Sequence, residues 1–137
     1  MTTLFLNNAF VDARQASVSV YDRSYLFGEG LFESFRSFDG KIPLLKDHVN
    51  RLEWSATFLG IPFPSDVNFE KVCLELLERN GLKDARFKML LSQSSEVSDL
   101  SDLSDKRGNL VIFCDPFDEK KIPPVYRLRT EQQVRDD

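Results

Sequence analysis

The sequence lacks several features that would assign it to a common class of protein. No apolar run is long enough to span a membrane, and the start has no basic segment followed by an apolar stretch. Basic side chains are outnumbered by acidic ones, 18 to 22, which gives a net charge of −4. A basic surface for nucleic acid or an anionic membrane is therefore not expected. We expect a cytoplasmic protein without a nucleic-acid or membrane partner.

Residues that bind metals or act as nucleophiles are also scarce. The two cysteines, Cys73 and Cys114, are far apart, and each lies in an apolar pattern. This favours buried free thiols over a redox or metal motif. His48 is the only histidine, so neither a metal site nor a histidine-dependent triad is expected. Alone, such a histidine is more often a structural hydrogen-bonding group.

The chain does contain enough apolar residues for a packed core. Its 137 residues are 42% hydrophobic and include twelve phenylalanines. This length fits one domain, or one small domain and the start of another.

Short strands and turns occupy much of the chain. Apolar alternation and turn residues predict strands over residues 3–11 with a turn at 7–8, and over 16–21, 31–38, 85–92 and 109–114. Asp39-Gly40 predicts a hairpin that returns through residues 41–45. Gly28 and Gly30 break the regular pattern and allow backbone angles closed to other residues.

Two consecutive helices are predicted in the middle of the chain. Residues 45–59 carry an apolar stripe and end at Gly60. Residues 67–80 carry a second stripe, with Ser65 or Asp66 as the cap and Gly81 as the stop. Strands, two helices and further strands favour an α+β fold. A dinucleotide-binding fold is disfavoured, because the glycines at 28 and 30 have no third glycine and no helix directly after them.

Two arginines are candidates for binding an anion. Alternation places Phe32, Ser34 and Arg36 on one face of a strand, where they could line an apolar pocket with one positive charge. Such a pocket suits the carboxylate of an amino acid or keto acid. Arg51 lies one turn after His48 on a helix face, and its planar donors suit a phosphate. The alternative for both arginines is an ordinary solvent-exposed position.

Two polar segments separate or follow these elements. Residues 93–108 indicate a solvated loop, or alternatively a functional lid. Residues 115–124 are charged and contain prolines, which is typical of a connector between domains.

One combination of motifs resembles a known enzyme family. Residues 22–33, DRSYLFGEGLFE, are followed by the Asp39-Gly40 turn and by His48-x-x-Arg51-Leu52. Over residues 3–115 this order and spacing resembles the class IV (fold type IV) pyridoxal-phosphate enzymes. These include branched-chain aminotransferases, D-amino-acid transaminases and aminodeoxychorismate lyases.

The resemblance implies a fold, a cofactor and site residues. It implies a small N-terminal domain over residues 1–115, an antiparallel sheet with two helices packed on it. A linker over 116–125 and the start of a larger catalytic domain over 126–137 would follow. Arg51 matches the arginine that binds the phosphate of pyridoxal 5'-phosphate. Phe27, Phe32 and Arg36 match positions on the substrate side, and Lys88 falls near a carboxylate-binding arginine. The family usually forms homodimers.

The chain departs from the family pattern in two places. Many relatives have a glycine-containing turn where this chain has residues 93–96, QSSE. None of its eight lysines matches the Schiff-base lysine, which in the family lies in the larger domain. No catalytic residue is therefore expected in this chain, which alone should be inactive.

The resemblance leads to one functional prediction and two alternatives. The prediction is the N-terminal part of an aminotransferase that exchanges an amino group between an amino acid and a 2-keto acid. The first alternative is an aminodeoxychorismate lyase on the same scaffold, although Glu33-Ser34 favours an aminotransferase. The second is a non-catalytic binding module, if 137 residues is the native length.

Overall fold

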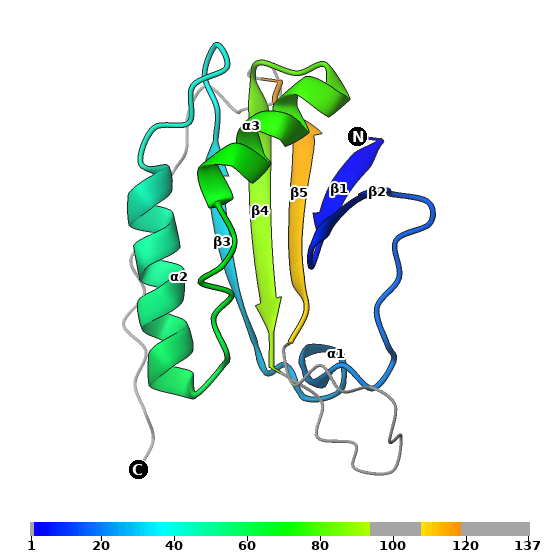
Figure 1. Ribbon diagram of the computed structural model, residues 1–137, viewed down its shortest axis with the longest axis vertical. Helices are drawn as coiled ribbons and strands as arrows, with labels where there is room; N and C mark the ends of the chain where they lie inside the picture. Colours follow the sequence, from blue (N-terminus) through cyan, green and yellow to red (C-terminus); the bar gives the residue numbers. More distant parts are fainter. Residues whose placement is uncertain (1, 94–107, 119–137) are drawn as a thin grey trace, which may run out of the picture.

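The protein folds as one antiparallel sheet covered on one face by two long helices (Figure 1). The computed structural model describes residues 2–93 and 108–118. Its five strands lie in the order β2-β1-β5-β4-β3, and every neighbouring pair is antiparallel. The predicted α+β class, with two helices packed on an antiparallel sheet, is confirmed.

The strands follow most of the predicted pattern, and one prediction is wrong. They are β1 (Thr3–Leu6), β2 (Ala9–Asp12), β3 (Gly30–Arg36), β4 (Ala85–Ser92) and β5 (Leu110–Pro116). The predicted strand over residues 16–21 is absent, and Val18, Val20 and Tyr21 are exposed. Alternating apolar residues form a strand only where a neighbouring strand completes the hydrogen bonds. Here the Ala16 N–H donates to Asp12 O, which turns the chain away from the sheet.

The turn after β3 is the predicted one, but its returning segment is shorter than predicted. Phe38 and Lys41 form an isolated bridge, and both residues of the turn have positive φ, +46° at Asp39 and +75° at Gly40. This is the geometry that the Asp-Gly pair predicts. Beyond the bridge at Lys41 no strand forms over residues 42–44, and α2 (Leu45–Leu59) begins at the next residue.

The helix bounds are confirmed at three of four ends. α2 has the predicted bounds, and Gly60 caps it with a φ of +68°. α3 (Phe69–Asn80) ends at Gly81 as predicted, but it begins two residues later than predicted. Its cap is Asn68 rather than Ser65 or Asp66, because the Asn68 side chain accepts from Lys71 N at 3.0 Å. Several polar residues in succession can each serve as a cap, and the sequence alone did not distinguish them.

The core lies between the two long helices and the covered face of the sheet. In Figure 1, α3 crosses in front of β4 and β5, whereas α2 runs alongside β3. The predicted stripe of α3 is buried, as are the two cysteines. Burial, with a smaller contribution from the Asp115 carboxylate, raises the pKa of Cys114 to about 12, so its thiol stays protonated. The prediction of buried free thiols is therefore confirmed.

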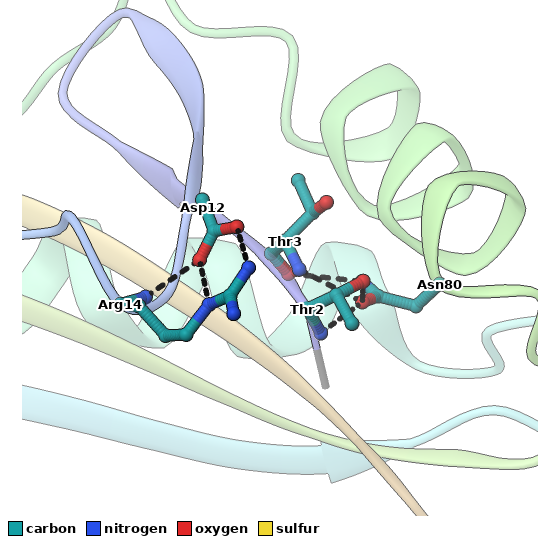
Figure 2. Close-up of polar contacts among 5 residues, drawn as sticks. All are labelled: Thr2, Thr3, Asp12, Arg14 and Asn80. Atoms are coloured by element: carbon teal, nitrogen blue, oxygen red, sulfur yellow. Dashed lines mark hydrogen bonds and ion pairs between the residues drawn. The ribbon is translucent and has the colours of Figure 1, made fainter.

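Side-chain hydrogen bonds tie the end of α3 to the first strand (Figure 2). The Asn80 side chain accepts from Thr2 N at 2.9 Å and from Thr3 N at 3.0 Å, and it donates to Thr3 O at 2.9 Å. Nearby, hydrogen bonds from Arg14 lower the pKa of the partly exposed Asp12 to about 2. The asparagine thus fixes one end of the covering helix against the sheet.

Two groups of predictions lie outside the described residues. The first is the polar loop, of which residues 94–107 are not described. The second is the linker and the tail that follows it, from residue 119 onwards. In the part of the chain that the structure describes, no helix has the length and apolar character needed to cross a membrane.

Candidate cofactor and substrate site

A short helix that the sequence did not predict packs at one end of the sheet. It is α1 (Arg23–Phe27), and Asp22 caps it by accepting from Ser24 N at 2.8 Å and from Ser24 Oγ at 2.5 Å. The motif that begins at Asp22 is therefore a capped helix turn that leads into β3.

The Asp22 carboxylate also links two strands. Its Oδ2 accepts from Ser92 Oγ and from Asn109 Nδ2, both at 2.6 Å, and only 5% of the residue is exposed. Burial alone would raise the pKa of Asp22. The hydrogen bonds from Ser24, Ser92 and Asn109 together outweigh burial and hold the pKa below its usual value. Asp22 is therefore ionised at neutral pH and joins α1 to the ends of β4 and β5.

Gly28 and Gly30 have different structural roles. Gly28 has a φ of +71° and caps α1, so it adopts the conformation that the sequence predicted. Gly30 is not among the positive-φ residues. A Cβ atom at Gly30 would lie 2.8 Å from the Ser24 Cβ. The first glycine supplies a backbone angle and the second allows α1 to approach β3 closely.

An ion-pair cluster joins α2 to the edge strand β3. The Arg51 guanidinium donates from Nε to Glu33 Oε1 at 2.6 Å and from Nη2 to Oε2 at 2.5 Å. His48 Nδ1 lies 2.8 Å from the same Oε2. The Glu33 residue is only 6% exposed, whereas 63% of the Arg51 side chain is exposed. Glu33 is therefore buried, whereas most of the Arg51 side chain is accessible.

The Arg51 side chain fits the phosphate of the implied cofactor. Its hydrogen bonds lower the pKa of Glu33 against the opposing effect of burial, and His48 adds to the lowering. In turn Glu33 raises the pKa of Arg51. Glu33 uses two of the five N–H groups of the guanidinium, and the exposed remainder can bind an anion with several donors.

The face of the sheet away from the helices holds the substrate-side candidates Phe32 and Lys88. A groove of about 500 Å³ is lined by Phe32, Ser34, Arg86, Lys88, Leu90, Phe113 and Asp115. The Phe32 ring is 65% exposed, and Lys88 Nζ lies 5.3 Å from its centroid. A second hollow of about 360 Å³ shares Phe32 and Leu90 and reaches Asp22 and Ser24. This open face can therefore receive a ligand with an apolar part and an anionic group.

The other two substrate-side candidates lie against neighbouring side chains. The Arg36 guanidinium carbon is 3.8 Å from the ring centroid of Phe38 and 3.6 Å from that of Phe117. The Phe27 ring lies 5.0 Å from the Arg23 guanidinium, which is paired with Glu29. Cation–π stacking of this kind holds an arginine side chain in place.

The structure thus divides the predicted site residues between two sides of β3. Arg51 contacts Glu33 on the covered side, whereas Phe32 and Lys88 face the open side. Sequence reasoning did not identify Glu33 or Asp22 as site-forming residues. The available signal was an acidic residue between Leu31 and Phe35 on the apolar face of a strand, which requires a nearby cation.

Comparison with known proteins identifies the family. The family model described as amino-transferase class IV matches residues 30–137. A Methanocaldococcus jannaschii protein named as a branched-chain-amino-acid aminotransferase is 39% identical over 112 residues, which are 81% of this chain and 38% of that protein. The aminodeoxychorismate lyase of Bacillus subtilis is 28% identical over 132 residues, which are 96% of this chain and 44% of the lyase.

A solved structure supports the same assignment. The branched-chain aminotransferase of the archaeon Thermoproteus uzoniensis, crystallised with norvaline, has a TM-score of 0.70 and 26% identity. The match covers 85% of this chain and 41% of that one. This chain therefore spans less than half the length of each of these proteins. The family match and the shared fold show that the chain belongs to the class IV aminotransferases.

Proposed function

We propose that the chain is the N-terminal part of a pyridoxal-phosphate-dependent enzyme that transfers an amino group between an amino acid and a 2-keto acid. The observation that best supports this proposal is the accessible Arg51 guanidinium, anchored to the buried Glu33 at the edge of the sheet. An anchored guanidinium with free donors suits a phosphate monoester.

In this proposal each residue of the chain binds or orients a ligand. Arg51 holds the cofactor phosphate. Phe32 packs against the apolar part of the substrate, and Lys88 attracts its carboxylate across the open-face groove. The resemblance alone assigns Phe27 and Arg36 to the substrate side, because neither is among the described residues that line that groove. The cofactor, when bound, supplies the electron sink for chemistry at the α-carbon.

The remainder of the longer protein completes the proposed enzyme. The resemblance assigns the Schiff-base lysine to the larger domain, so we expect the 137-residue chain alone to be inactive. We further propose that the complete enzyme is a cytoplasmic homodimer, as is usual in the family.

An aminodeoxychorismate lyase is the second candidate function. The similarity to the Bacillus subtilis lyase extends over 96% of this chain and supports this candidate. Glu33, which in the sequence favoured an aminotransferase, is bonded to Arg51 and His48. Because its carboxylate binds these two side chains, Glu33 does not distinguish the two reactions.

The test is a substrate survey of the full-length protein after loading with pyridoxal 5'-phosphate. Exchange of an amino group between amino acids and 2-keto acids supports the first function. Release of 4-aminobenzoate with pyruvate from aminodeoxychorismate supports the second. A full-length protein that binds no pyridoxal 5'-phosphate contradicts both. The binding module is favoured only if the native protein is 137 residues long.

A further inference from the structure

We propose that Glu33 is a positioning residue that aims the Arg51 guanidinium at the cofactor phosphate, and that His48 holds Glu33 in place. This inference depends on the proposed function, because it takes Arg51 as the phosphate-binding residue. It assigns a role in ligand affinity to a buried acid on the covered side of β3.

The geometry restricts the arginine in the way that this role requires. A free arginine side chain has many rotamers, so binding an anion normally involves ordering it. The two hydrogen bonds to Glu33 fix both the position and the plane of the guanidinium. The acid itself lies on a sheet strand whose full length pairs with β4. Phosphate would therefore meet an arginine that is already ordered.

His48 makes Glu33 a more rigid anchor. His48 Nδ1 lies 2.8 Å from Glu33 Oε2 and 3.3 Å from Arg51 Nη2, and the two contacts require opposite tautomers. Because an ionised carboxylate only accepts hydrogen bonds, the shorter contact assigns the proton to Nδ1. The imidazole ring lies 5.1 Å from the Phe35 ring, and 18% of the His48 side chain is exposed. Thus Oε2 receives donors from two positions one helical turn apart on α2.

The distribution of exposure favours a role in binding over a role in stability alone. The acid is buried and the arginine is mostly exposed, so the guanidinium is held by Glu33 and can still contact a ligand. An opposing effect exists, because the negative charge of Glu33 weakens the attraction of Arg51 for an anion. We expect the ordering of Arg51 to outweigh this charge effect.

The experiment is a double-mutant cycle on the full-length protein. Dissociation constants are measured for pyridoxal 5'-phosphate and for pyridoxal, which lacks the phosphate, in wild type, Glu33→Gln, Arg51→Gln and the double variant. We expect Glu33→Gln to weaken pyridoxal 5'-phosphate binding about tenfold, with pyridoxal unchanged. In the Arg51→Gln background, Glu33→Gln should have no further effect on either ligand.

Other results overturn the proposal in recognisable ways. Unchanged or tighter binding of pyridoxal 5'-phosphate in Glu33→Gln means that ordering does not dominate, and equal losses for both ligands mean a structural role. If Arg51→Gln leaves pyridoxal 5'-phosphate binding unchanged, the assignment of Arg51 itself fails. That outcome is distinct from a failure at Glu33.

A pair of variants at His48 keeps the proposal testable if Glu33→Gln does not fold. His48→Asn retains a donor near the Nδ1 position, whereas His48→Leu removes it. We expect His48→Leu to weaken pyridoxal 5'-phosphate binding by several-fold and His48→Asn to restore most of the affinity. Equal affinities in these two variants would contradict the role of His48.

Discussion

The two faces of the sheet differ although the same strands form both. On the covered face, Phe87, Met89 and Ile112 have no exposed surface. Their neighbours in sequence face the other way, where Lys88 and Phe113 line the open groove. Alternation along a strand therefore separates residues that stabilise the fold from residues that are available to a ligand.

The edge strand β3 is the exception that connects the two faces. Glu33 is a charged residue on the covered side, and it is accommodated because α2 brings Arg51 and His48 to it. On the opposite side of the same strand, Phe32 is exposed in the groove. The proposed ligand contacts thus lie on both sides of one strand at the edge of the sheet.

The largest effect on stability is expected when residues on the two faces of β4 are replaced one at a time. We expect Phe87→Ala to lower the free energy of unfolding by about 3–5 kcal/mol, because it leaves a cavity in the core. Lys88→Ala, one residue later, should change it by less than about 0.5 kcal/mol. Urea denaturation followed by circular dichroism measures both. Similar losses of unfolding free energy for the two variants would contradict the claim that only the covered face stabilises the fold.

A smaller effect is expected at the end of the sheet, where Asp22 joins α1 to β4 and β5. Asp22→Ala removes the acceptor of several buried donors, and we expect a loss of about 2–3 kcal/mol. The matched control is Asp12→Ala, since Asp12 is ionised and paired but only partly buried, and little change is expected there. If the two variants had equal effects, burial would not be what makes the Asp22 network important.

The same carboxylates predict a direction for the effect of acid. The folded-state pKa values of Asp22 and Glu33 are both lowered, so their stabilisation is complete above the unfolded values of about 3.9 and 4.3. It is lost as the pH falls through the lower folded-state values. Urea midpoints should therefore drop steeply below about pH 4, and the drop should be smaller in Asp22→Ala. Increased stability on acidification would contradict this assignment.

The smallest effect concerns the turn that leads from β3 towards α2. Gly40 has a φ of +75°, and no atom lies within 4 Å of the position of an added Cβ. We expect Gly40→Ala to lower the free energy of unfolding by about 1 kcal/mol through backbone strain alone. Gly40→Asn should cost less, because asparagine tolerates this conformation. Thermal denaturation compares the two, and equal losses would indicate a cause other than backbone conformation.

The fold was largely predictable because its signals are local. The apolar stripes of α2 and α3, the glycines that end them and the Asp39-Gly40 turn each predict structure within a few residues. The predicted strand over residues 16–21 failed because a strand also needs a partner, which alternation does not specify. The short α1 was missed although Asp22 and Gly28 cap it locally, because its five residues include no buried residue and so carry no apolar stripe.

The site was less predictable than the fold. The resemblance selected Arg51 and Phe32, but it did not indicate that they lie on opposite sides of β3. The Arg36 side chain, assigned to the substrate side, stacks between Phe38 and Phe117, a contact that involves residues from distant parts of the chain. Pairing across long sequence separations determines such contacts, and one sequence without its structure does not report them.

The most direct test is a crystal structure of the full-length protein with pyridoxamine 5'-phosphate. We expect phosphate oxygens to lie within hydrogen-bond distance of the Arg51 guanidinium while Glu33 still binds its Nε and Nη2 groups. We also expect the ligand ring to lie beside the β3 edge, near Phe32. A phosphate bound elsewhere, with Arg51 facing solvent, would contradict the proposed role of Arg51.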